Sequence, residues 1–326
     1  MDTHPVFPST PMRKGMYESF YLRAFSPREP VGIWIRHTVH KRPGHSPHGS
    51  VWCTLFDSRD PAPSMHKLTS EHLEVPAGEW IGVGGQASMG PGGALGSCGP
   101  ARWSLRFSTS ERALHHLSPD WLYRAPLPRT KLSSPAPNAS FEGTFEISGQ
   151  EPLELAGWSG MVGHNWGSEH AERWIWLHGA GFEGVPDAWL DVAIGRIAIA
   201  GRMTPWIANG SLSLEGERHR IGGLIKARPQ VSEGPSGCSL TLAGERDLTI
   251  DARFNAPDGS IAGWRYADPD GGEHDVLNCS IAAVELVIGF PGGRPARTIR
   301  TAHGGVYELG LREHDHGVKI ADFPDW

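Results

Sequence analysis

Residues 160–179, GMVGHNWGSEHAERWIWLHG, hold three histidines, three tryptophans and two glutamates. Imidazole and carboxyl groups can transfer protons or bind a metal ion, and indole rings form apolar walls that attract cations. The segment is therefore compatible with a metal site, with the lining of a ligand pocket, or with an aromatic part of the core. Most of what the sequence indicates about function depends on which of these applies.

The three histidines do not have the spacing of a helical metal site. His164, His170 and His178 are six and eight residues apart, whereas the HExxH pattern needs two histidines four residues apart on one helix. Three ligands could still converge from a loop and a strand. A metal-dependent hydrolase that uses the His164/His170/His178 cluster is therefore kept as the second alternative function, and no metal is expected in the preferred one.

An extended chain gives the segment a more specific chemistry. Alternation in a strand places Glu172, Trp174, Trp176 and His178 on one face. If this face borders an apolar cavity, desolvation raises the pKa of the Glu172 carboxyl and makes it a proton donor. Indole faces can stabilise a carbocation by about 2 kcal/mol. This predicts acid-assisted hydration or cyclisation of an unsaturated, hydrophobic (isoprenoid or polyketide-like) molecule, without a cofactor.

The remaining expected site residues belong to the same segment. His164 and His170 are expected to act with Glu172 in catalysis, by orienting the acid or a water molecule. The residues expected to bind the substrate are Asn165, Trp166, Trp174, Trp176 and His178.

The opposite orientation of this strand fits the alternation equally well. Ile175 and Leu177 would then face the core, the indoles would pack between domains, and Glu172 would pair with a surface arginine. A non-catalytic carrier of hydrophobic ligands, using the same cavity without chemistry, is the first alternative function.

Strand patterns dominate the elements that must position these residues. Residues 32–41 alternate, with Ile33 and Ile35 on one face and Trp34 and Arg36 on the other. The glycine-rich segment 82–99 lacks the features of a phosphate-binding loop and predicts β-turns. Asp-Gly turns are expected at 256–260 and 268–272.

Three further expectations concern the organisation of the chain. Residues 109–117 predict a short helix, because Ser108 and Glu111 have capping-box spacing. The proline- and serine-rich segment 125–138 predicts a connection across the surface. Many short strands with little helix predict an all-β protein of two consecutive antiparallel β-barrels, 1–205 and 206–326.

Composition excludes several classes of partner. The net charge is −6 and the 30 Lys and Arg are scattered, so a nucleic acid is not an expected partner. The four cysteines are far apart, which predicts free buried thiols. We see no signal peptide and no apolar run of about 18–20 residues, so a cytoplasmic protein without a membrane span is expected. Peripheral contact with a membrane is left open, and the oligomeric state is not predicted.

The segments PLPRTKLSSPAPNASFEGTFEI, GWSGMVGHNWGSEHAERWIWLHG, LNCSIAAVELVI and HGGVYELGLRE together resemble the lipocalin-like superfamily of carotenoid hydratases, tocopherol cyclase-like proteins and AttH-like proteins. The resemblance extends from about Tyr17 to Arg312, and its most specific element is His-Asn-Trp-Gly followed by Trp-x-Trp. It implies two calycin-type barrels, a ligand cavity near their contact, apolar substrates, and no metal or organic cofactor. The residues that it implies at or beside the cavity are His164, Asn165, Trp166, Glu172, Trp174 and Trp176. The subgroup is not identified, because the block is embedded in GMVGHNWGSEH, and the reaction therefore remains open.

Overall fold

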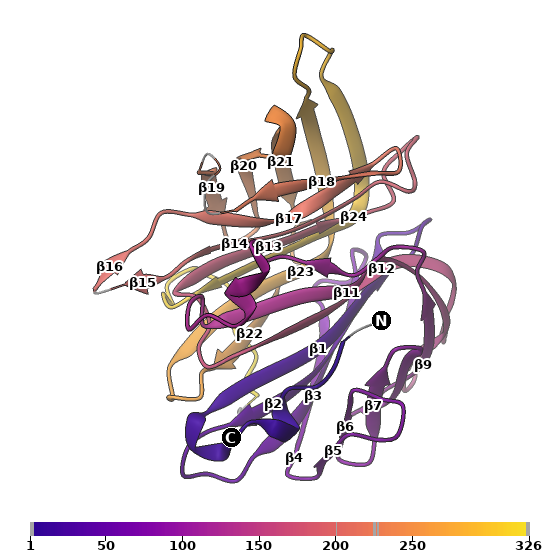
Figure 1. The fold of residues 1–326 in the computed structure, drawn as a ribbon. Coiled ribbons are helices and arrows are strands. Elements are labelled where there is room, and N and C mark those ends of the chain that lie inside the picture. Colours follow the sequence, from indigo (N-terminus) through magenta and orange to yellow (C-terminus); the bar gives the residue numbers. More distant parts are fainter. Residues whose placement is uncertain (1–2, 200, 224–225, 227, 324–326) are drawn as a thin grey trace.

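The computed structural model describes residues 3–199, 201–223, 226 and 228–323. These residues form two large antiparallel sheets and one small hairpin, and the helical parts are four short 3-10 segments (Figure 1). The expected all-β fold with very little helix is confirmed. The 3-10 segments are η1 (Phe7–Ser9), η2 (Met12–Lys14), η3 (Asp120–Tyr123) and η4 (Glu245–Asp247).

The first sheet has twelve strands and curls into a nearly closed barrel. Its strands follow the order β4-β3-β2-β1-β12-β11-β9-β8-β7-β6-β5, and β10 pairs with β11. Their bounds are β1 (Met16–Phe25), β2 (Val31–Lys41), β3 (His48–Asp57), β4 (Ser64–Ser70), β5 (Leu73–Glu74), β6 (Ile81–Val83), β7 (Ala87–Gly90), β8 (Gly93–Cys98), β9 (Ala101–Ser108), β10 (Leu114–His115), β11 (Thr130–Ile147) and β12 (Leu153–Gly167).

The second sheet has ten strands, in the order β18-β17-β14-β13-β24-β23-β21-β20-β19 with β22 paired to β23. An isolated bridge between Ile221 and Gly244 joins β18 to the end of β20, so this sheet also curls back on itself. The remaining strands, of which β15 and β16 form the separate hairpin, are β13 (Arg173–Gly179), β14 (Trp189–Arg196), β15 (Ala198–Ile199), β16 (Arg202–Met203), β17 (Ile207–Leu214), β18 (Glu217–Gly222), β19 (Gln230–Gly234), β20 (Gly237–Ala243), β21 (Thr249–Asn255), β22 (Ala262–Ala267), β23 (Glu273–Gly289) and β24 (Arg297–Leu311).

The chain passes from the first sheet to the second between β12 and β13, at 168–172. In Figure 1 the strands before this link form the lower body and most of those after it the upper one, while β22 lies beside the lower body. The division expected at 205/206 falls between β16 and β17, within the second run of strands, and does not coincide with the change of sheet. The histidine- and tryptophan-rich segment therefore spans the link.

The two sheets share a packed contact on the outside of the first barrel. Side chains on one face of β2 and β3 fill the first barrel, while Trp34 and Trp52 on the other face pack against Trp264 of β22. Burial of such large aromatic groups typically stabilises a fold by about 1.5–3 kcal/mol each. The alternation predicted for 32–41 is confirmed. Both faces of β2 are buried, because one fills the first barrel and the other packs against the second sheet.

A buried arginine strengthens this contact. Arg23 of β1 donates to the backbone carbonyls of Ser280 and Gly305, which belong to β23 and β24 of the other sheet. Burial lowers the pKa of this guanidinium to about 9. Its terminal nitrogens are satisfied by carbonyl oxygens and by His178, so the protein itself provides its partners.

The helix predicted at 109–117 is wrong. Thr109 donates its hydroxyl to the carbonyl of Asn138 and accepts the amide of Glu111, and Leu114–His115 pairs with β11. The Glu111 carboxylate binds Arg218 of the second sheet instead of capping a helix. Tertiary contacts thus override a capping pattern that is worth only about 1 kcal/mol.

The surface connection predicted at 125–138 is wrong for residues 130–138, which belong to β11. Prolines cannot donate to a β-ladder, and Pro135 and Pro137 lie where the register of β11 against β12 shifts. The prolines therefore mark bulges inside a long strand rather than a loop.

The expectations for the glycine-rich segment, for the 268–272 turn and for the cysteines are confirmed. The glycine-rich segment 82–99 forms β6 to β8 and their turns, and 268–272 closes the hairpin of β22 and β23. The four cysteines are free and buried. None of the helices among the described residues has the length and apolar character needed to cross a bilayer.

Candidate functional site

A cavity of about 500 Å³ lies between the two sheets. Its wall is mostly apolar, and it combines β1, β2, β11 and β12 of the first sheet with β13, β14, β17, β22 and β24 of the second. Its aromatic and polar lining residues include Tyr21, Trp34, Arg36, Asn165, His170, Trp174, Trp176, Tyr266 and Glu308. A cavity of this size and polarity is typical of sites for small hydrophobic ligands.

The indole-bearing side of β13 borders this cavity. Trp174 and Trp176 both line it, whereas Ile175 and Leu177 are fully buried in the core of the second sheet. Both faces of the strand are thus buried, one against packed side chains and one against a void. The alternation left open whether the indole face or the Ile175/Leu177 face is turned inward. The structure buries both, the first against the cavity and the second against the core.

One end of the cavity wall is exposed and apolar. Trp121, Leu127 and Ile199 line the cavity, and they are 59%, 39% and 47% exposed. Large exposed apolar side chains close together usually mark a contact or entry site. Here they place the entrance between η3 with the segment that follows it and the β15–β16 hairpin.

Glu308 is the carboxyl group in the wall of the cavity. It is 8% exposed; Oε1 accepts a hydrogen bond from Trp174 Nε1 at 3.0 Å, and Oε2 accepts one from Asn278 Nδ2 at 3.1 Å. Burial raises the pKa of Glu308, and the hydrogen bond from Trp174 and the charge of Arg36 reduce that rise. The environment expected for Glu172 is therefore found at Glu308, which the sequence reasoning missed.

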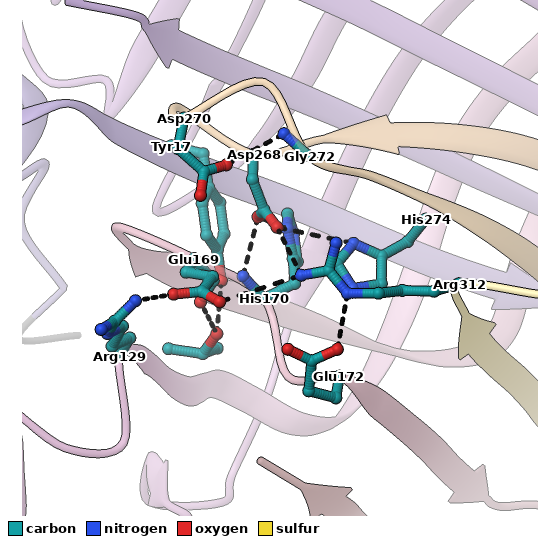
Figure 2. Close-up of polar contacts among 11 residues, drawn as sticks. Tyr17, Arg129, Glu169, His170, Glu172, Asp268, Asp270, Gly272, His274 and Arg312 are labelled. Atoms are coloured by element: carbon teal, nitrogen blue, oxygen red, sulfur yellow. Dashed lines mark hydrogen bonds and ion pairs between the residues drawn. The ribbon is translucent and has the colours of Figure 1, made fainter. Parts of the chain in front are cut away.

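Glu172 itself lies outside the cavity wall. Its Oε2 pairs with Arg312 Nε at 2.6 Å, as Figure 2 shows, and the side chain is 23% exposed. This corrects the aromatic, desolvated environment expected for it. The physical reason is that Glu172 precedes β13, in the link between the sheets, and does not continue the alternation of the strand.

His170 connects the cavity to a buried polar cluster. Its backbone N donates to Asp268 Oδ1, and its Nδ1 lies 2.7 Å from the same oxygen (Figure 2). Its ring stacks on Tyr17 at 3.9 Å between centroids and also on Trp174. Burial opposes ionisation of Asp268, but the hydrogen bond and charge of His170 outweigh it and lower the pKa of Asp268.

The hairpin turn at 268–272 brings His274 to the same cluster. His170, Asp268 and His274 each offer one ligand atom within 4.8 Å of the others. Arg312 Nη2 lies 3.7 Å from Asp268 Oδ2, the oxygen that faces His274 Nδ1 at 3.6 Å. A divalent cation at this point would face that guanidinium, so we interpret the cluster as a support for His170. Burial lowers the pKa of His274 to about 3, which keeps its ring neutral.

His164 and Trp166 point away from the cavity. His164 Nε2 lies 2.7 Å from Glu18 Oε1 and its ring stacks on Phe20, inside the first barrel. Trp166 stacks on His164 and packs against the same core. Asn165, the residue between them, lines the cavity. Since neighbouring residues of a strand face opposite sides, β12 contributes only Asn165 to the wall.

His178 is buried near, but outside, the cavity wall. Its Nε2 donates to the carbonyl of Pro137 at 2.9 Å, and its Nδ1 accepts from Arg23. Burial and the Arg23 charge lower its pKa to about 4, which fits this neutral tautomer. His164, His170 and His178 are therefore held by three different sets of partners, which contradicts the alternative in which these three converge on one metal ion.

Sequence comparisons give no family model that matches the chain. Two sequences from strains of Mycobacterium tuberculosis, both described as uncharacterized proteins, are 26% identical to it over 303 residues. The alignments cover 91% of this chain and 87% of each relative.

Solved structures show the fold. CghA in complex with Sch210972 superposes with a TM-score of 0.64 at 10% identity, covering 92% of this chain and 90% of CghA. Kievitone hydratase from Nectria haematococca gives 0.55 at 9% identity, covering 95% and 93%. A putative AttH from Nitrosomonas europaea gives 0.53 at 13% identity, covering 95% and 98%. The expected resemblance is thus confirmed for the fold: the chain has the lipocalin-like architecture that these proteins share.

Proposed function

We propose that the protein binds a hydrophobic, unsaturated small molecule in the cavity between its sheets and catalyses its acid-assisted hydration or cyclisation. The observation that carries this proposal is Glu308, a buried carboxyl with a raised pKa in an otherwise apolar wall. Kievitone hydratase, whose name states a hydration, has the same fold, which supports the proposal without identifying a substrate.

The chemistry follows from what surrounds Glu308. Its protonated carboxyl donates a proton to one carbon of a double bond, which forms a C–H bond and leaves a cation on the other carbon. Trp174, Trp176 and Trp34 line the same cavity and offer indole faces to that charge. Water then adds to the cation and releases a proton to the Glu308 carboxylate, so that the net reaction adds one water molecule. In a cyclisation, an internal nucleophile takes the place of water.

Two hydrogen bonds hold the acid in place. Trp174 and Asn278 each donate to one Glu308 oxygen, and His170 stacks on the Trp174 ring. A positioned general acid typically contributes about 10²–10⁴-fold to the rate. We assign that role to Glu308, with His170 as a positioning residue.

The test compares two conservative variants. Apolar molecules that co-purify with the protein are extracted, identified by mass spectrometry, and incubated with the enzyme in isotopically labelled water. Glu308→Gln should bind the substrate but lose label incorporation by at least about 10²-fold. Glu172→Gln, which changes the carboxyl that the sequence pattern indicated, should retain most of the turnover.

The outcomes separate the possible functions. Loss of turnover in Glu172→Gln alone would return the acid role to Glu172. Binding without turnover in the wild type, for every unsaturated molecule extracted, would favour the carrier instead of the enzyme.

A further inference from the structure

Arg36 places a buried positive charge in the cavity wall. It belongs to β2, is 5% exposed, and lines the cavity beside Trp34. Its Nε donates to Ser19 Oγ at 2.7 Å, and its guanidinium lies over the ring of Tyr266, 3.9 Å from the centroid. Both contacts fix the plane of the guanidinium, so its position in the wall is well defined.

The guanidinium lacks an anionic partner within the described part of the protein. No carboxylate there lies within ion-pair distance of it, and Nη1 is buried without a hydrogen-bond partner. The charge of Arg36 lowers the pKa of Glu308, but Glu308 accepts its hydrogen bonds from Trp174 and Asn278. An unpaired buried charge is unfavourable, so folded proteins normally pair such groups.

Arg23 is a second buried arginine, and the protein itself supplies the hydrogen-bond partners of its guanidinium. Its terminal nitrogens contact the carbonyls of Ser280 and Gly305 and the ring of His178. Arg23 does not line the cavity, whereas Arg36 does. The contrast indicates that the partner of Arg36 is supplied from the cavity.

Two other polar atoms of the cavity wall are also without partners. They are Asn165 Oδ1 and His170 Nε2, both buried. The His170 ring lies 5.8 Å from that of Tyr266, the ring on which Arg36 stacks. Arg36 and His170 therefore flank the same tyrosine, and the polar part of the wall is concentrated there.

We propose that the occupant of the cavity is an apolar molecule that carries a carboxylate, and that Arg36 binds this carboxylate. The proposal rests on the proposed function, since it concerns the ligand of the same cavity. A planar guanidinium matches a carboxylate with two parallel hydrogen bonds, which makes this pair strong and directional. The carboxylate would also cancel the Arg36 charge that lowers the pKa of Glu308, and so favour the proton-donating form of that acid.

Decanoate and decanol test the proposal, because they differ only in the polar end. Each is used to displace phenylnaphthylamine, an uncharged apolar fluorophore, from the protein. The wild type should bind decanoate at least about tenfold more tightly than decanol, the effect of one charge-assisted hydrogen bond. Arg36→Met should remove this preference, so that decanoate no longer displaces the fluorophore more effectively than decanol does. Arg36→Lys keeps a charge and should retain part of the preference.

The outcomes distinguish this inference from the cavity itself. If phenylnaphthylamine does not bind the wild type, the proposed function fails with the inference. If it binds but decanoate and decanol compete equally, or if Arg36→Met weakens both to the same extent, only the carboxylate inference is overturned. If Arg36→Met does not fold, the ratio of the wild-type affinities for decanoate and decanol tests the inference. An apolar cavity without a cation that binds the carboxylate would prefer decanol.

Discussion

The raised pKa of Glu308 predicts a specific dependence of stability on pH. Glu308→Gln keeps the size of the side chain and removes the titrating proton. In the folded wild type, burial holds the pKa above the ordinary glutamate value of 4.5, while in the unfolded chain it returns to that value. The folded state therefore binds more protons than the unfolded state as the pH rises above 4.5.

This difference fixes the sign of the effect. Glu308 contributes its full stabilisation below 4.5 and loses it as the pH rises through the folded pKa. The free energy of unfolding of the wild type, relative to Glu308→Gln, should thus fall with pH. One titrating proton limits the slope to about 1.4 kcal/mol per pH unit.

The measurement is urea denaturation of both proteins, followed by tryptophan fluorescence at several values between about pH 5 and pH 8. Other titrating groups, such as the Glu18–His164 pair, are common to both proteins and largely cancel in the difference. A difference that is flat, or that increases with pH, would show that Glu308 is ionised in the folded protein and would refute its assignment as the acid.

Two other substitutions separate the cavity from the rest of the fold. In Gly310→Ala, the new Cβ would lie 2.1 Å from Trp174 Cε2, so we expect a loss of about 1–3 kcal/mol in stability and weaker binding of phenylnaphthylamine. Gly234→Ala, where the Cβ meets open space, is the control and should change neither. In Glu18→Ala, His164 and the amides of Val6 and Phe7 lose their acceptor. Urea denaturation should show a loss on the order of 3 kcal/mol, with the fluorophore affinity unchanged because this pair lies inside the first barrel. Weaker binding in Glu18→Ala, or undisturbed binding in Gly310→Ala, would contradict this arrangement.

Periodicity predicts which side chains share a face, but not which face borders a void. The alternation of 32–41 correctly grouped Trp34 with Arg36, and that of 172–178 grouped Trp174 with Trp176. It could not show that His164 faces the first barrel and Asn165 the cavity, because both sides of β12 are buried. That decision depends on how the second sheet packs against the first.

Glu308 and Glu285 show the same limit. Each interrupts an apolar strand of the second sheet, and such an interruption is the one sequence signal that could have indicated Glu308. Glu285 pairs with Arg300 at the surface, while Glu308 is buried under the first barrel. The difference comes from which part of the sheet is covered, and local sequence does not encode it.

The central claim is that the indole side of β13 borders a cavity that accepts an apolar molecule. It is tested most directly by titrating the wild type and Ala193→Trp with phenylnaphthylamine, since Ala193 lines the cavity and pairs with Trp176. Ala302→Trp, at an exposed position of β24, is the matched control. We predict saturable binding to the wild type and to Ala302→Trp, and its loss in Ala193→Trp. Undiminished binding in Ala193→Trp, or no saturable binding in the wild type, would contradict the account.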